Sequence, residues 1–477
     1  MKTNSGKISI TKKDVAWGYI GQLFSLFSGL ITLAIILKML SPEEVGMNYI
    51  MLTISTLVSL LDFGFAAQFG LNFTLIHSGS QRLLKEGVEH NENGQINYHL
   101  LAVLLETAKK VYRRLSLFCI FLMLTFGTLY IYNVTNKFDS VHNSLYIWIL
   151  YSISTYFNIY YIYYVSLLRG AGYISEINKA EIISKLTYIA LCVSLLYCGM
   201  GLMSVVIANF IAPFVQRWYC RRVYFTEELV KKIDIRIKKN EIKETFITIW
   251  HNTKKRGINL IGSYMVNKSS MFIIGFFLPL SSIGSYGLLL QLTNFVMVIS
   301  QSMFNSFYPI FSKLRVENKK EELIKSTALS IVINLLMMIV GCAIIVFIVP
   351  ELLVIFNSQT KLPTIEVCVV YCIAQILENN HSVFSTLITS NNEVPFVKSS
   401  LLSGAAIIIL TILSLTYTNC DLLGVVFAPL IVQAMYNNWR WPKWVLDEFH
   451  ISFINYLRVG CVELKQSIRK LILSLFS

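Results

Sequence analysis

Charged residues are scarce in this sequence, and long stretches of it contain none. Asp, Glu, Lys and Arg make up 14% of the 477 residues, whereas hydrophobic residues make up 55%. The apolar residues gather in blocks of about 20, which is the length that a helix needs to cross the hydrocarbon core of a bilayer. This pattern excludes a soluble globular protein and predicts an all-α polytopic membrane protein.

The sequence also lacks the motifs of soluble enzymes. It contains no Walker A sequence, no HExxH and no Gly-x-Ser-x-Gly, and Gly170-Ala-Gly172 lacks the third glycine of a dinucleotide fingerprint. We therefore expect no cofactor, and a source of energy other than ATP bound by this chain.

No pair of CxxC motifs occurs among the nine cysteines, so we expect free thiols that act as small buried hydrophobes, and no bound metal. Most of them lie in or beside apolar stretches: Cys119, Cys192, Cys198, Cys342, Cys368, Cys372 and Cys461.

About twelve apolar stretches are long enough to span a membrane. They begin near Ala16, Met47, Leu115, Tyr146, Ala180, Leu202, Gly257, Tyr286, Thr327, Thr364, Ser399 and Leu422. The longest polar interruption, residues 217–256, follows the sixth stretch. We predict an N-terminal six-helix lobe (1–216), a basic cytoplasmic linker (217–256), a C-terminal six-helix lobe (257–444) and an amphipathic tail (445–477) along the cytoplasmic surface.

The positions of the basic residues predict the orientation. Nearly all of the 41 Lys and Arg residues lie in the N-terminal segment, the even-numbered connections and the tail. Only Lys137 and Lys361 lie in odd-numbered connections, and only Lys38 and Lys268 are assigned to spans. Because basic loops stay in the cytoplasm, we expect both termini there. The same distribution explains the net charge of +14 without a nucleic-acid partner.

Polar residues recur at helical spacing in several spans, which keeps one face of each helix away from lipid. For any one residue, helix packing is the simpler explanation, but several such stripes together indicate a hydrated cavity, in which tyrosine rings suit sugars. The candidate substrate-binding residues are Gln22, Ser25, Tyr156, Tyr160, Asn267, Gln291 and Asn294. The third, ninth and eleventh spans are almost wholly aliphatic, and we expect them to face lipid.

Lys268 lies near the middle of the seventh span, where a cation costs roughly 2.5 to 3.5 kcal/mol. Either it attracts an anionic group such as a phosphate, or it forms an ion pair with Asp62 or Glu378. Glu378 and His381 are three residues apart on one helix face. They, and Asp62, are candidates to bind a coupling proton, although a buried structural histidine is an equal alternative.

Four short runs and the overall layout resemble a known family. The runs are Leu40-Ser-Pro-Glu-Glu-Val-Gly46, Leu61-Asp-Phe-Gly64, Leu168-Arg-Gly170 and Ile273-Ile-Gly275, the last followed by Ile283-Gly-Ser-Tyr286. The sequence resembles the O-antigen and polysaccharide flippases of the multidrug/oligosaccharidyl-lipid/polysaccharide exporter superfamily.

The resemblance implies two six-helix lobes around a central cavity, lined partly by the first, second, seventh and eighth spans. It implies an undecaprenyl-diphosphate-linked oligosaccharide as substrate, moved from the cytoplasmic to the periplasmic leaflet by alternating access. Lys268 is the position that would meet the diphosphate. A polysaccharide polymerase and a chain-length regulator are the partners that such a flippase implies.

Three alternatives remain open at this point. A cation-coupled multidrug exporter of the same superfamily would use the acidic Asp62 and Glu378, whereas Lys268 argues against it. A lipid II flippase is expected to have two extra C-terminal helices, and the tail looks interfacial instead. A membrane-embedded polymerase or glycosyltransferase needs a large extramembrane loop, and the loops predicted outside are short.

Overall fold

The computed structural model describes residues 12–85, 95–389, 395–418 and 420–475, and within them the chain is helical without a strand. The chain divides into two compact units, Met1–Ile261 and Gly262–Ser477. The all-α prediction is confirmed.

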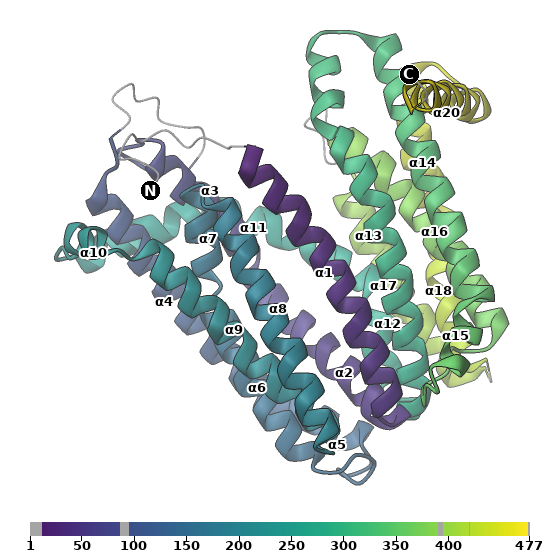
Figure 1. The fold of residues 1–477 in the computed structure, drawn as a ribbon, viewed down its shortest axis with the longest axis horizontal. Coiled ribbons are helices and arrows are strands. Elements are labelled where there is room, and N and C mark those ends of the chain that lie inside the picture. The colour runs from purple at the N-terminus through teal and green to yellow at the C-terminus, as the bar shows by residue number, and fades with distance from the viewer. Residues whose placement is uncertain (1–11, 86–94, 390–394, 419, 476–477) are drawn as a thin grey trace. The chain divides into compact units, whose positions relative to one another are not determined.

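The first unit contains the helices drawn in purple to teal in Figure 1. They are α1 (Lys12–Met39), α2 (Pro42–Ser59), η1 (Leu60–Asp62), α3 (Phe65–His77), α4 (Tyr98–Leu122), the π-helical η2 (Met123–Gly127), α5 (Thr128–Val134), α6 (Ser144–Tyr160), α7 (Tyr163–Gly170), α8 (Ile174–Tyr197), α9 (Leu202–Tyr224), α10 (Glu227–Ile233) and most of α11 (Lys239–Asn267).

The second unit begins near the end of α11 and continues to the C-terminus. Its helices are α12 (Ser269–Ile274), α13 (Leu280–Val316), α14 (Lys320–Phe347), α15 (Val349–Ile355), α16 (Ile365–Thr389), α17 (Val397–Tyr417), α18 (Asp421–Met435), α19 (Asn437–Phe449) and α20 (Phe453–Leu475).

Eight helical segments of the described chain are long and apolar enough to cross a membrane. They coincide with the first, second, third, fifth, eighth, ninth, eleventh and twelfth predicted spans: Ala16–Met39, Pro42–Asp62, Tyr98–Val134, Ile174–Tyr197, Leu280–Arg315, Lys320–Phe347, Val397–Tyr417 and Asp421–Phe449. The remaining predicted spans fall on α6, α9, α11 with α12, and α16. A multi-pass membrane protein is therefore confirmed, and a count of about twelve stays a prediction.

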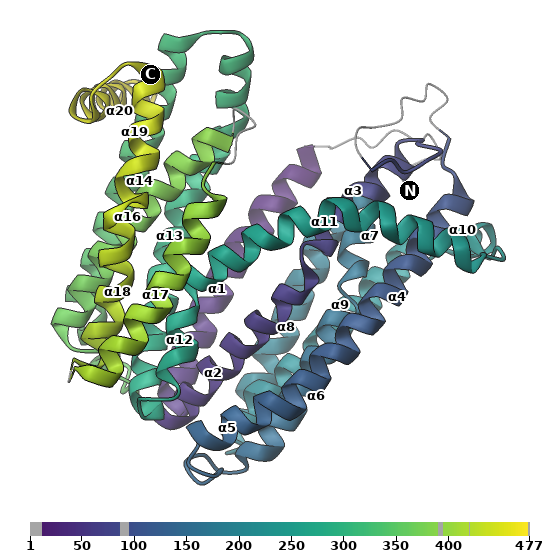
Figure 2. The ribbon, with the colours of Figure 1, turned by 180° about the vertical axis from the view of Figure 1, so that it is seen from behind.

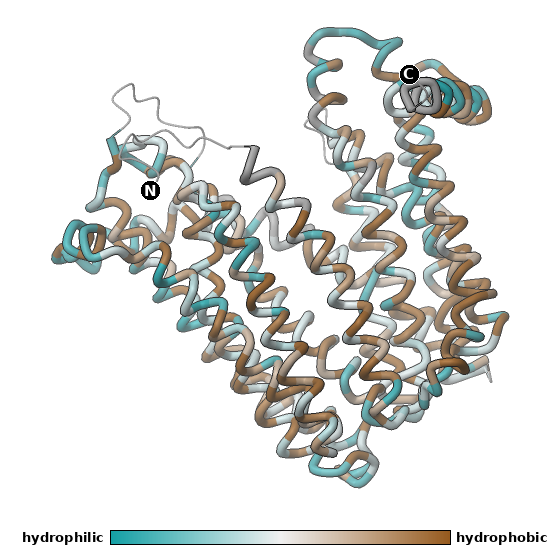
Figure 3. The backbone as a smooth tube through the Cα atoms, in the orientation of Figure 1, coloured by the Kyte–Doolittle hydropathy of each residue, from teal (hydrophilic) through white to brown (hydrophobic). Residues whose placement is uncertain are grey.

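Polar residues concentrate outside these segments. Figure 3 shows hydrophilic backbone along α10 and in the turn between α13 and α14, and hydrophobic backbone through most of α14 and α15. Near α10, Glu241 accepts hydrogen bonds from the backbone N–H of Lys238 at 2.8 Å and from the ring of His99 at 3.1 Å. These two contacts lower the pKa of Glu241, so its carboxylate joins the start of α11 to α4 at neutral pH.

A capping box starts α2. The Ser41 hydroxyl accepts a hydrogen bond from the Glu44 backbone N–H, the Glu44 carboxylate accepts one from the Ser41 N–H, and Pro42 occupies the first turn. The other Glu44 oxygen accepts the backbone N–H of Leu202 at 2.8 Å. One carboxylate thus caps two helix starts, which explains the Ser-Pro-Glu-Glu run physically.

Two predicted spans are interrupted within the first unit. Phe63 and Gly64 adopt φ angles of 47° and 84° between η1 and α3, and glycine takes such a conformation at little cost. The fourth span breaks at Tyr161 and Ile162, between α6 and α7. In the second unit, Lys268 has φ −129° and separates α11 from α12.

The second unit has an aromatic core close to the ends of its long helices. Phe304 and Phe311 of α13, Phe384 of α16, Trp441 of α19 and Tyr456 of α20 are buried together. Figure 2 shows α20 lying across the direction of α14 and α19. This core therefore holds the amphipathic tail on the helical bundle.

The cysteine prediction is partly wrong. All nine cysteines are free, but Cys198 and Cys461 are exposed, not buried, because each lies on a helix end or face that no described neighbour covers. Cys420 is also exposed.

Candidate functional site

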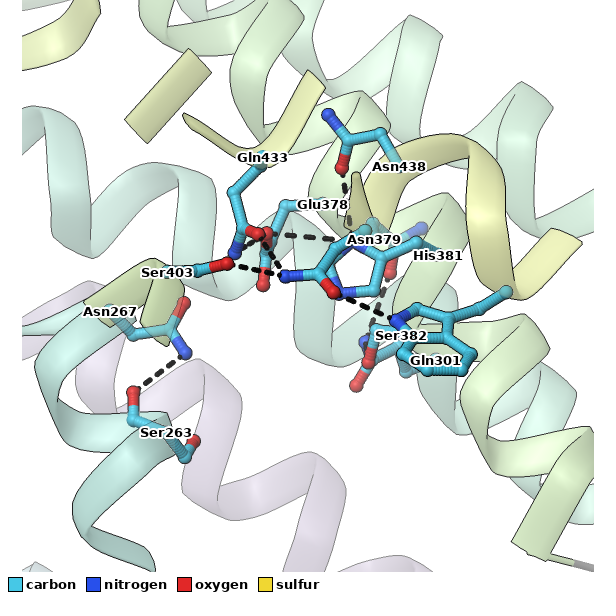
Figure 4. Close-up of polar contacts among 12 residues, drawn as sticks. Ser263, Asn267, Gln301, Glu378, Asn379, His381, Ser382, Ser403, Gln433 and Asn438 are labelled. Carbon is cyan, nitrogen blue, oxygen red and sulfur yellow. Dashed lines mark hydrogen bonds and ion pairs between the residues drawn. The ribbon is translucent and has the colours of Figure 1, made fainter. Parts of the chain in front are cut away.

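A network of polar side chains joins four helices of the second unit (Figure 4). We call it the Glu378 network, and its members are Glu378 and His381 of α16, Ser403 of α17, Gln433 of α18, and Asn437 and Asn438 of α19. Such side chains inside an apolar bundle require partners, since an unmade hydrogen bond there costs more than in water.

Glu378 and His381 are the predicted residues that the structure brings together. His381 Nδ1 lies 3.6 Å from Glu378 Oε2, and the two side chains are only 12% and 14% exposed. Gln433 Nε2 donates to Glu378 Oε2 at 3.0 Å, and His381 Nδ1 lies 3.1 Å from Asn438 Oδ1. At 3.6 Å the imidazole and the carboxylate lie within ion-pair distance but beyond a direct hydrogen bond.

The rest of the network joins the break between α18 and α19. Asn437 Nδ2 donates to Gln433 Oε1 at 2.6 Å and to Ser403 Oγ at 2.9 Å, and Trp441 Nε1 donates to Asn437 Oδ1 at 3.0 Å. The break at Tyr436, with φ −144°, turns Asn437 toward Gln433 on the preceding helix. Sequence analysis did not select Gln433 or Asn437, although two amides four residues apart in an apolar span were the available signal.

A second set of amide side chains in the same unit is more completely buried. Gln301 Nε2 donates to Asn379 Oδ1 at 3.0 Å, and Asn379 Nδ2 donates to Asn334 Oδ1 at 2.6 Å. Asn334 and Asn379 are 1% and 0% exposed. The ninth span, expected to face lipid, also has a face within the bundle, because α14 contributes a buried Asn334 that needs an amide partner.

Lys268 lies in the break between α11 and α12 and is half-buried. Its backbone N–H donates to the Tyr264 carbonyl at 2.8 Å. None of the ion pairs between described residues involves Lys268, and Glu378 is bound to Gln433 and His381 instead. The structure thus holds a lysine in an apolar segment with no carboxylate of the described residues in an ion pair with it.

The other predicted residues of this unit are more exposed or lie apart from the network. Asn267 is exposed and donates to the Ser263 carbonyl of its own helix at 3.0 Å (Figure 4). On α13, Gln291 is half-buried and Asn294 is exposed.

In the first unit, Asp62 is the last residue of η1, directly before the break at Phe63 and Gly64. Tyr112 of α4 donates its hydroxyl to Asp62 Oδ1 at 2.8 Å, and the Ala66 backbone N–H donates to Oδ2 at 3.2 Å. Asp62 therefore caps the start of α3 and links it to α4.

Ser25 meets a cation that the sequence analysis placed outside the spans. The Lys185 ammonium contacts Ser25 Oγ and lies 3.0 Å from Glu181 Oε1. Because α8 begins at Ile174, Lys185 lies well inside the segment Ile174–Tyr197, so the assignment of only Lys38 and Lys268 to spans is wrong. The four-residue spacing of Glu181 and Lys185 was the available signal. Gln22, one turn before Ser25, is exposed.

Tyr156 and Tyr160 stack on α6 with ring centroids 6.2 Å apart. Their neighbours surround a second missed cation, Arg217, which lies inside α9 and not in the linker. Its guanidinium lies 4.7 Å from the Tyr161 ring centroid and donates to Asn158 Oδ1 at 2.7 Å. Among the described ion pairs none includes Arg217, and its Nη1 is buried without a hydrogen bond.

This geometry can be compared with known proteins. A family model described as "Polysaccharide biosynthesis protein" matches residues 11–315. The chain belongs to this polysaccharide biosynthesis family. The matched range contains the whole described first unit and Lys268, α12 and nearly all of α13, whereas Glu378 lies beyond it.

Solved structures show the same fold for this polysaccharide biosynthesis protein. The first is an inward-facing multidrug resistance MATE family transporter of the MOP superfamily, with 12% identity, a TM-score of 0.65, and coverage of 90% of this chain and 95% of that one. The second is the lipid II flippase MurJ in an inward closed conformation, with 13% identity, a TM-score of 0.60, and coverage of 94% and 90%.

A third is a MOP superfamily transporter from Pyrococcus furiosus, with 12% identity, a TM-score of 0.52, and coverage of 95% and 100%. No curated protein matches the sequence. The resemblance to the flippases of this superfamily is thereby confirmed at the level of family and fold, and the relatives are transporters.

Proposed function

We propose that this protein is a flippase for an undecaprenyl-diphosphate-linked oligosaccharide, such as an O-antigen repeat unit. It moves the sugar from the cytoplasmic to the periplasmic leaflet of a bacterial inner membrane by alternating access, with both termini in the cytoplasm. A polysaccharide polymerase and its chain-length regulator then receive the product.

The observation that carries this proposal is the state of Lys268. It interrupts a helix within an apolar segment, and no described ion pair neutralises its ammonium. Discontinuous helices are where transporters bind their substrates, and a lysine ammonium is a compact charge that suits a phosphate. Membership in a polysaccharide biosynthesis family supports a lipid-linked sugar as the bearer of that phosphate.

Further residues support sugar recognition in the same proposal. Tyr156 and Tyr160 offer stacked rings in a membrane helix, and rings of this kind contact the apolar faces of sugars. Asn267, Gln291 and Asn294, with Gln22 and Ser25, supply amide and hydroxyl groups that can bind sugar hydroxyls.

The test is complementation of a strain that lacks its own flippase. We expect Lys268→Ala to reduce surface polysaccharide by tenfold or more at unchanged membrane level, because one lost charge-assisted hydrogen bond is worth about 1.5 to 3 kcal/mol. Lys361→Ala, which removes a lysine from a connecting loop, is the matched control and should complement fully.

Two further variants separate substrate binding from ion pairing. Lys268→Ala combined with Glu378→Ala should stay inactive, because Glu378 is bound to Gln433 and His381 and not to Lys268. Full activity of Lys268→Ala alone, or recovery in the double variant, would refute the role proposed for Lys268.

We further propose that the Glu378 network holds the coupling proton. Glu378 and His381 of α16 are close and little exposed, and they bond to residues of α18 and α19, so a change of charge there alters the packing of these helices. In proteoliposomes with a pH-sensitive dye inside, we expect substrate to drive proton movement in the wild type. Glu378→Gln keeps the side-chain shape and should abolish that proton movement, whereas an unchanged dye response would exclude this site.

A cation-coupled multidrug exporter is the second candidate. The observation that favours it is the carboxylate of Glu378 in a fold shared with a MATE transporter at a TM-score of 0.65. Drug resistance conferred on a sensitive strain, without rescue of surface polysaccharide, would select it over the flippase.

A further inference from the structure

The C-terminal helix α20 has three different faces. Tyr456 is fully buried in the core of the second unit, and Gly460 on the same face packs against the Ala328 carbonyl and the Val332 side chain of α14. A side chain at position 460 would collide with that backbone, so glycine permits close contact there. This face holds α20 against the bundle.

The direction of α20 differs from that of the long helices. His450 ends α19 with φ 55°, and the chain turns before Phe453. Figure 1 shows α20 almost end-on, whereas α14 and α16 lie close to the plane of the picture. Because α14 is long and apolar enough to span a membrane, a helix that crosses it near its beginning would lie along the membrane surface.

A second face of α20 is apolar and exposed. Ile454, Cys461 and Ile468 follow one another at intervals of seven residues, about two turns, and therefore form one stripe. Ile454 is 72% exposed and Ile468 is 49% exposed. The stripe of these three side chains runs along α20, on a different face from the one that packs against α14.

The third face is basic and borders the stripe. Arg458 and Lys465 each follow a stripe residue by four positions, and Arg469 follows Lys465 by four, so all three lie beside the stripe around the helix. All three are exposed. The single carboxylate of α20, Glu463, lies toward the α14 side, away from them.

We infer that α20 binds the acidic phospholipids of the adjacent leaflet, with the stripe inserted at the acyl boundary and the three basic residues on the headgroups. A helix of this kind gains affinity both from buried apolar area and from anionic lipid. The inference does not depend on the proposed flippase activity.

Cys461 allows a direct test, because it lies in the stripe and is exposed. In the Cys198→Ser, Cys420→Ser background, the rate at which an uncharged polyethylene-glycol maleimide modifies Cys461 is measured in two kinds of vesicle. One is pure phosphatidylcholine, and the other contains about a third phosphatidylglycerol. We expect modification to be at least fivefold slower in the anionic vesicles, because each basic residue contributes about a factor of five.

Matched variants test the role of charge. Arg458→Gln, Lys465→Gln and Arg469→Gln together should remove the difference between the two vesicles. Lys231→Gln, Arg236→Gln and Lys238→Gln remove the same charge from the segment around α10 and should leave the difference intact. High salt should also reduce the difference in the wild type, so the result does not depend on the triple variant folding.

Equal rates in the two vesicles for the wild type would overturn the inference, as would a salt-independent difference. A slowing that rises with the protein-to-lipid ratio and ignores lipid charge would assign the stripe to a second copy of the chain, and would also overturn it.

Discussion

At the scale of single residues, the charged and amide side chains inside the apolar helices differ in how completely they are partnered. Asp62, Glu378 and Lys185 have partners that explain their positions, whereas Lys268 and Arg217 have no carboxylate among the described ion pairs. Since a cation without a counter-ion in an apolar segment is costly, we propose a function for Lys268, whereas Arg217 has the Asn158 amide and the Tyr161 ring as partners.

The buried amide pair gives a prediction at this scale. Asn379→Leu should lower the free energy of unfolding by about 1 to 3 kcal/mol, because it leaves Asn334 and Gln301 without their partner. Asn334→Leu should cost a similar amount, and the double variant should cost clearly less than the sum. Thermal unfolding in detergent measures all three. Additive losses would show that the two amides do not interact.

At the scale of helices, the capping box at the start of α2 has a second task. Its carboxylate also accepts the Leu202 N–H at the start of α9, so one side chain fixes two helix ends. The breaks at Gly64, Tyr161 and Lys268 likewise place polar residues where a continuous helix would not. Irregular backbone within a membrane segment is stable only where other protein groups form hydrogen bonds with its free N–H and C=O groups.

We predict that Ser41→Ala lowers stability by about 1 kcal/mol through the loss of one cap. Glu44→Ala should cost more, because it removes the hydrogen bonds to both Ser41 and Leu202. The comparison is made by thermal unfolding of the purified proteins in one detergent. Equal losses for the two variants would mean that the contact with Leu202 contributes nothing.

At the scale of the whole molecule, the basic residues predict which ends of the helices face the cytoplasm. The three exposed cysteines make that prediction testable, since they lie in different connections. Cys198 follows α8, Cys420 precedes α18, and Cys461 lies in the tail helix. The predicted orientation puts the first two outside and the third inside.

A membrane-impermeant maleimide added to intact spheroplasts should therefore label Cys198 and Cys420 but not Cys461. Cys461 should react only after the membrane is opened. Single-cysteine variants at each position separate the signals. Labelling of Cys461 in intact spheroplasts would contradict the predicted orientation.

Much of the fold was predictable because a membrane-spanning helix requires a long block of apolar residues, which is easily recognised in the sequence. Blocks of apolar residues gave the helical, multi-pass class. The Ser-Pro-Glu-Glu run, used in the sequence analysis only for the family resemblance, is a capping box in the structure. Glu378 and His381 lie on one helix face as expected, since residues three apart do so regardless of the rest of the fold.

Other features depended on contacts between distant segments. Asn334 is one amide in an aliphatic stretch, and only the approach of Asn379 from another helix explains it. Arg217 looked like a linker residue until α9 was seen to continue to Tyr224. The sequence by itself determined which segments are helical and apolar enough to lie in a membrane, because hydropathy and helical periodicity are local properties. Tertiary structure alone decided which polar groups meet and, among the described residues, which cations have no carboxylate partner, because hydrogen bonds between helices join residues far apart in the chain.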